Sequence, residues 1–146
     1  MADNVNTDAA ARSVKRGNAR MKLWAFGRVE GPCVSPSIKA YGGGDVVREY
    51  EAKLSDSCPV LDAIRKKLAD KANRVEVVVR ADFHLWGQRL RLSDLDNLAK
   101  TLLDGLFGKF GGKGIKPIDR HVHRLELTKV GVNKTKECTE WWIYRM

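Results

Sequence analysis

The fold is indicated most clearly by residues 74–107, which read RVEVVVRADFHLWGQRLRLSDLDNLAKTLLDGLF. Over residues 75–85, apolar side chains occupy every second position, which is the period of a β-strand with one buried face. Over residues 95–107, leucines recur at the three- and four-residue spacing of an amphipathic helix. This stretch therefore predicts a strand over residues 74–86 and a helix over residues 95–107.

Weaker patterns on both sides predict the remaining elements. Strands are expected over residues 21–30, 121–130 and 138–144, and helices over residues 45–54 and 59–72. Strands and helices in this order are typical of a mixed β-sheet covered by helices. We expect one small domain of the α/β (α+β) class over residues 21–146. Residues 1–20 are polar, net basic and without sustained periodicity, and we expect them to form a disordered arm.

The composition is that of a soluble, globular protein. The chain has 146 residues, of which 43% are hydrophobic and 31% are charged. No apolar run approaches the roughly 20 residues of a membrane span, and the first residues are polar. The cysteines Cys33, Cys58 and Cys138 are odd in number and far apart, which argues against a zinc ribbon or a disulfide scaffold. A cytoplasmic protein without a membrane partner is therefore expected, and its three histidines are expected to have surface or packing roles.

The charge is strongly positive. Lys and Arg number 27 against 18 Asp and Glu, which gives a net charge of +9. Such a surplus favours a polyanionic partner, either nucleic acid or an anionic membrane surface. Part of it lies in a glycine-rich loop with Lys109, Lys113 and Lys116, which could follow a phosphate backbone. The alternative interpretation is that these lysines only keep the loop solvated and bind no partner.

One acidic cluster stands out in this basic chain. Asp94 and Asp96 are one residue apart at the start of the helix predicted over residues 95–107, and Asp119 precedes the next predicted strand. Mg²⁺ prefers oxygen ligands and is typically bound by one or two carboxylates together with substrate phosphates. The cluster therefore suggests a divalent-metal site for phosphodiester chemistry.

The same residues also allow a purely structural interpretation. Ser93 could cap the helix, with Asp96 three positions later completing a capping box. Asp96, Lys100 and Asp104 are spaced four apart and could form exposed ion pairs on the helix surface. The pattern alone does not decide between a metal site and a capped helix.

A longer motif resembles the RusA family of Holliday-junction resolvases, which are associated with phages and prophages. Its elements are, in order, residues 94–100 (DLDNLAK), residues 104–106 (DGL), residues 119–122 (DRHV) and Lys129. The resemblance covers residues 74–146. It implies a RusA-like fold, a bacterial or phage origin, and a homodimer that cuts two opposed strands of a four-way DNA junction with Mg²⁺, or alternatively Mn²⁺, as the cofactor.

The resemblance also implies roles for individual residues. Asp94, Asp96 and Asp119 correspond to the metal-binding and catalytic carboxylates, and Lys100 to the catalytic lysine. Asn97 and Asp104 would support the site, and Arg89 and Arg91, in the segment before the motif, would contact DNA. Two other functions stay open, namely a non-catalytic DNA-binding module and a nuclease of the same fold that acts on other branched DNA.

Overall fold

The computed structural model describes residues 21–36, 42–70, 72, 74–108 and 121–146, which form a single α+β domain. The predicted fold class is confirmed. In chain order the elements are β1 (Lys22–Glu30), α2 (Gly44–Asp56), α3 (Leu61–Ala69), β2 (Val77–Leu85), α4 (Gln88–Leu92), α5 (Leu95–Phe107), β3 (Val122–Gly131), the 3-10 turn η3 (Lys134–Lys136) and β4 (Cys138–Arg145).

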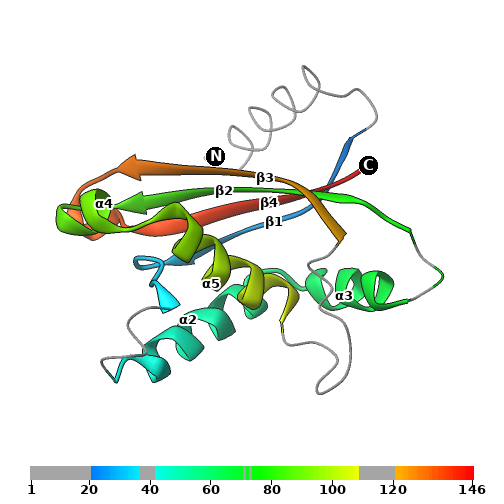
Figure 1. Cartoon of the computed structure of the whole chain (residues 1–146), viewed down its shortest axis with the longest axis horizontal. Coiled ribbons are helices and arrows are strands. Elements are labelled where there is room, and N and C mark those ends of the chain that lie inside the picture. The colour runs from blue at the N-terminus through cyan, green and yellow to red at the C-terminus, as the bar shows by residue number, and fades with distance from the viewer. Residues whose placement is uncertain (1–20, 37–41, 71, 73, 109–120) are drawn as a thin grey trace.

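The four strands form one mixed sheet in the order β1-β4-β2-β3. Strand β4 is antiparallel to both of its neighbours, whereas β2 and β3 are parallel. A parallel pair needs a crossover connection, and α4 and α5 lie within it. Helices α2, α3 and α5 cover the same face of the sheet (Figure 1).

The core lies between this sheet face and the helices. Alternate side chains of β2 point into it, as the period of two predicted, and the leucines of α5 meet them from the other side. Each fully buried side chain of this size stabilises the fold by about 1.5–3 kcal/mol. The apolar residues of these two elements that have no exposed surface are Val77, Val79, Ala81, Phe83, Leu85, Leu98, Leu102 and Leu106.

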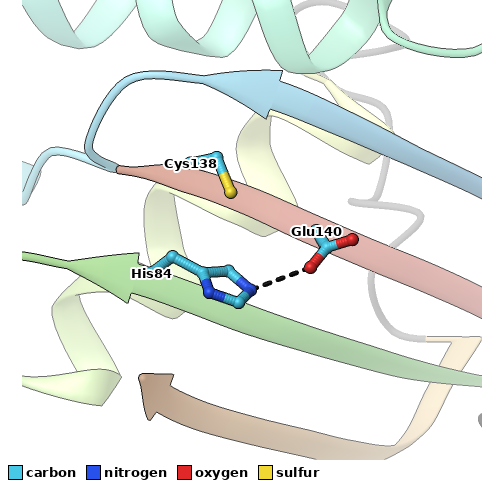
Figure 2. A group of neighbouring side chains, drawn as sticks. All are labelled: His84, Cys138 and Glu140. Carbon is cyan, nitrogen blue, oxygen red and sulfur yellow. Dashed lines mark ion pairs between the residues drawn. The ribbon is translucent and has the colours of Figure 1, made fainter. Parts of the chain in front are cut away.

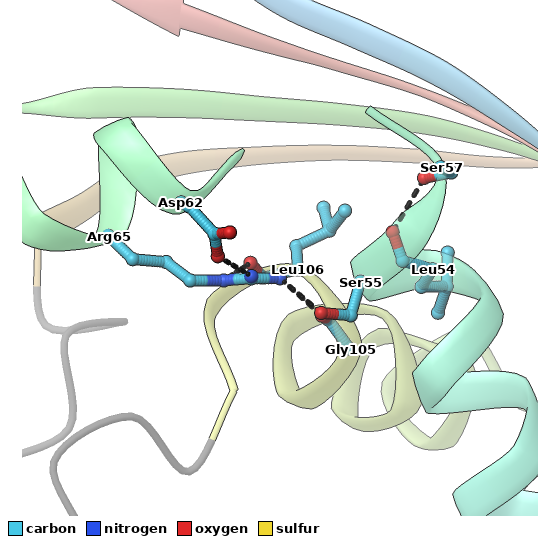
Figure 3. Close-up of polar contacts among 7 residues, drawn as sticks. All are labelled: Leu54, Ser55, Ser57, Asp62, Arg65, Gly105 and Leu106. Carbon is cyan, nitrogen blue, oxygen red and sulfur yellow. Dashed lines mark hydrogen bonds and ion pairs between the residues drawn. The ribbon is translucent and has the colours of Figure 1, made fainter. Parts of the chain in front are cut away.

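A buried arginine joins the three covering helices (Figure 3). Arg65 of α3 is 5% exposed, and its Nε donates to the Leu106 carbonyl at 2.8 Å. Its Nη2 donates to the Gly105 carbonyl at 3.1 Å and to Ser55 Oγ of α2 at 2.8 Å. The last carbonyls of a helix lack partners within it, so a cation here stabilises the end of α5 and fixes its position against α2 and α3.

Some element boundaries differ from the predicted ones. Helix α3 ends at Ala69 rather than at residue 72, because Asp70 is extended and its Oδ1 accepts the N–H of Ala72 at 3.0 Å. Strand β2 begins at Val77 rather than at residue 74. Helix α4 was not predicted. The predicted arm over residues 1–20 lies outside the described residues. In the part of the chain that is described, no helix has the length and apolarity of a bilayer span.

Candidate functional site

The candidate site is built around the first turn of α5. Asp94 is the N-cap residue, with an extended backbone, and its carbonyl accepts the N–H groups of Asn97 and Leu98, both at 3.1 Å. The capping interpretation placed Ser93 at this position, which is wrong by one residue. Within the described residues, the Asp94 side chain makes no capping hydrogen bond. Its carboxylate is exposed to solvent.

Asp94 lines a shallow hollow of about 350 Å³ at this end of the molecule. The other lining residues come from α4, from the turn between α4 and α5, from α5 itself and from the segment after β1. They are Ser35, Gln88, Arg89, Leu92, Ser93 and Asn97. The structure therefore brings together three predicted site residues: Asp94, Asn97 and Arg89. Two of them offer oxygen ligands and the third a positive charge.

Asp96, Lys100 and Asp104 lie on successive turns of α5, as predicted, and all three are exposed. None of them lines the hollow beside Asp94. No ion pair joins them among the described residues, so the surface pairs of the capping interpretation are not formed. Their side chains remain accessible to solvent, a metal or a substrate.

Arg89 has a structural partner that the sequence did not reveal. Its Nε donates to Glu137 Oε2 at 2.9 Å and its Nη2 donates to Oε1 at 2.6 Å, while the N–H of Trp86 also reaches Oε2, at 3.1 Å. The Glu137 side chain is only 4% exposed. The hydrogen bond from Arg89 lowers the pKa of Glu137, so the carboxyl is charged. This bidentate pair joins α4 to the residue just before β4, whereas the DNA-binding roles of Arg89 and of the exposed Arg91 stay predictions.

Lys129 positions the turn that carries Asp94. From β3, its Nζ donates to the carbonyl oxygens of Leu90, at 2.7 Å, and Ser93, at 2.9 Å. The motif pointed to Lys129 without indicating what it does. The structure shows that it ties the α4–α5 turn to the sheet, directly next to Asp94 in the chain.

The third predicted carboxylate, Asp119, lies outside the described residues, as do Lys109, Lys113 and Lys116. His121 is the nearest described residue that follows Asp119, and its Nδ1 lies 3.0 Å from the carbonyl of Val75, just before β2. Lys129 follows His121 by eight positions along β3, which corresponds to about 26 Å. His121 therefore lies toward the start of the β2–β3 pair and Asp94 toward its end.

Comparisons with known proteins do not identify the chain. No family model matches it, and a search of curated proteins gave no significant match.

Proposed function

We propose that this protein is a Mg²⁺-dependent, structure-specific endodeoxyribonuclease that resolves four-way DNA junctions as a homodimer. The observation that carries the proposal is the position of Asp94. Its carboxylate stands at the N-cap of α5 without making a capping hydrogen bond among the described residues, and it shares a hollow with Asn97. A solvent-facing acid in this place, within a chain of charge +9, suits metal-assisted chemistry on a polyanion.

The donor atoms fit the proposed metal. Asp94, Asp96 and Asn97 offer only carboxylate and amide oxygens, which are the ligands that Mg²⁺ prefers. Bound there, Mg²⁺ would lower the pKa of a coordinated water and stabilise charge on the leaving oxygen. Asn97 would orient the neighbouring carboxylate, and the Lys100 ammonium would offset charge that develops on the phosphate. Asp104 follows Lys100 by one turn and adds a further exposed carboxylate of the motif to α5.

Asp119 is the third carboxylate that the motif assigns to the metal site. In the proposed homodimer, Asp94 and Asp96 of one subunit combine either with Asp119 of the same chain or with Asp119 of the partner subunit, and mixed dimers distinguish the two arrangements.

The first test is cleavage of a four-way junction, a Y-fork and a linear duplex in Mg²⁺ and in EDTA. We expect Mg²⁺-dependent cleavage of the junction, which Asp94→Asn abolishes while junction binding in EDTA remains. The matched control is Asp56→Asn, because Asp56 is an exposed carboxylate at the end of α2. Cleavage of the Y-fork at least equal to that of the junction would favour a nuclease for other branched DNA. Binding without cleavage by the wild type would favour the non-catalytic module.

Mixed dimers test the shared site. Asp94→Asn and Asp119→Asn homodimers should both be inactive, because each of their sites lacks one carboxylate. A heterodimer of the two variants contains one complete site if the site is shared, so it should nick a single strand. If each subunit holds its own three carboxylates, the heterodimer stays inactive and the shared arrangement is refuted.

A further inference from the structure

The sheet face opposite the helices carries a second group of metal-ligand side chains, on the two central strands (Figure 2). His84 of β2 stands directly opposite Cys138 of β4 in the antiparallel register, and Glu140 is two residues further along β4. Residues two apart on a strand share a face, and those opposite each other on neighbouring strands have Cβ atoms about 4.5–5.5 Å apart. The register alone thus places the three side chains together.

Their ligand atoms converge. The nitrogen, sulfur and oxygen donors all lie within 4.8 Å of one another, and His84 Nε2 is 2.8 Å from Glu140 Oε1. The group is largely shielded from water, since Cys138 is 2% exposed and the side chains of His84 and Glu140 are 19% and 14% exposed. Within the described part of the chain, His84 Nε2 is buried and makes no hydrogen bond of acceptable geometry.

We propose that His84, Cys138 and Glu140 bind a divalent transition-metal ion of the zinc class. A combination of imidazole, thiolate and carboxylate ligands suits Zn²⁺ and is too soft for Mg²⁺, so this site differs in chemistry from the one at Asp94. Three protein ligands would leave one position open for water or another ligand. On binding, the Cys138 sulfur forms a bond to the metal and its proton is released to solvent.

The surroundings favour a metal ligand over a reactive thiol. Cys138 is only 2% exposed, so solvent reagents reach its thiol poorly and it is a poor nucleophile. Asp82 stands opposite Glu140 and adds a further carboxylate to this face. Arg28 of β1 also stands opposite Glu140, but its Nε is directed to Glu30 Oε1 at 2.8 Å.

Titration of the metal-free full chain with Co²⁺ tests the proposal. Co²⁺ binds at zinc sites, and its absorption spectrum shows which kinds of ligand it has. We expect a thiolate-to-cobalt charge-transfer band with tetrahedral visible bands, both of which Zn²⁺ abolishes by displacement. Cys138→Ser should lose the charge-transfer band. The matched control, Cys58→Ser, should keep it, because Cys58 lies outside the group. The Asp94 site has no sulfur and does not contribute to this band.

Cys138 is buried, so its replacement could unfold the protein, and two further variants keep the sulfur. His84→Gln and Glu140→Gln should each weaken Co²⁺ binding at least tenfold while circular dichroism shows a folded chain. The absence of a charge-transfer band in the wild type would overturn the proposal. So would unchanged Co²⁺ affinity in both variants. Neither result bears on junction cleavage, which is measured separately in Mg²⁺.

Discussion

Replacing Lys129 with methionine should test how the turn before α5 is held in place. Lys129 Nζ donates to the Leu90 and Ser93 carbonyls, and the ammonium is half-buried between β3 and this turn. Methionine keeps an unbranched apolar stem but removes the charge and all three donors. The Lys129→Met variant therefore leaves two carbonyl oxygens without their partner and leaves the packing of the stem largely intact.

The expected loss of stability follows from these two bonds. A hydrogen bond to a charged group contributes about 1.5–3 kcal/mol, so two fully buried ones would contribute roughly 3–6 kcal/mol. The turn is partly exposed, and water can reach the carbonyl oxygens once the ammonium is gone. We therefore expect the free energy of unfolding to fall by about 2–3 kcal/mol.

Urea unfolding measures this loss as a lower midpoint at an unchanged m-value. The matched control is Lys136→Met in η3, where the side chain is exposed, and it should change the free energy by no more than about 0.5 kcal/mol. Under conditions where both variants are folded, Lys129→Met should also slow junction cleavage by roughly 100-fold, because the carboxylate of Asp94 is no longer held in place. Equal stabilities of the two variants would refute the role assigned to Lys129.

Two further predictions concern the helices and the arginine pair. Gly105→Ala should lower the free energy of unfolding by about 1–3 kcal/mol, because the new Cβ would lie 2.6 Å from Leu54 Cβ of α2. Helix propensity alone would favour alanine over glycine, so a melting temperature above that of the wild type would contradict this prediction. The hydrogen bond from Arg89 lowers the pKa of Glu137 in the folded state. The stability it contributes is therefore present above the unfolded glutamate pKa of about 4.3 and is lost as the pH falls through the lower folded value. Urea unfolding at decreasing pH measures the difference in free energy of unfolding between the wild type and Glu137→Gln, which should shrink as the pH falls below the unfolded glutamate pKa. A difference that does not depend on pH would show that the charge of Glu137 does not stabilise the fold.

Much of the fold was predictable because its signals are local. The alternation along β2 and the leucine spacing of α5 reflect one buried face each. Helix α5 spans the predicted residues, and β2 lies within the predicted range but begins at Val77. Helix α4 was missed because its five residues include no buried side chain, so no apolar face marks it. Helix α3 ends early through a side-chain contact of Asp70, which apolar spacing does not record.

The candidate site was predictable only where it is local. Asp94 and Asn97 are three residues apart at one helix end, and the motif identified both. The partners of Arg89 and Lys129 could not be predicted, because Glu137 and Ser93 are distant in sequence and approach only once the strand order and register are fixed. The same holds for His84 and Cys138, which become neighbours because β4 pairs with β2.

The place of β4 in the sheet has a consequence for how the protein is made. The last strand in the sequence occupies an interior position, with β1 on one side and β2 on the other. Until the ribosome has added residues 138–145, β1 has no neighbour and β2 pairs only with β3. A nascent chain at this stage leaves unpaired the edges of β1 and β2 that β4 later joins, and such edges can pair with other chains during aggregation. The domain can therefore complete its sheet only after β4 has left the ribosome, so chaperone binding before that point would protect the two edges.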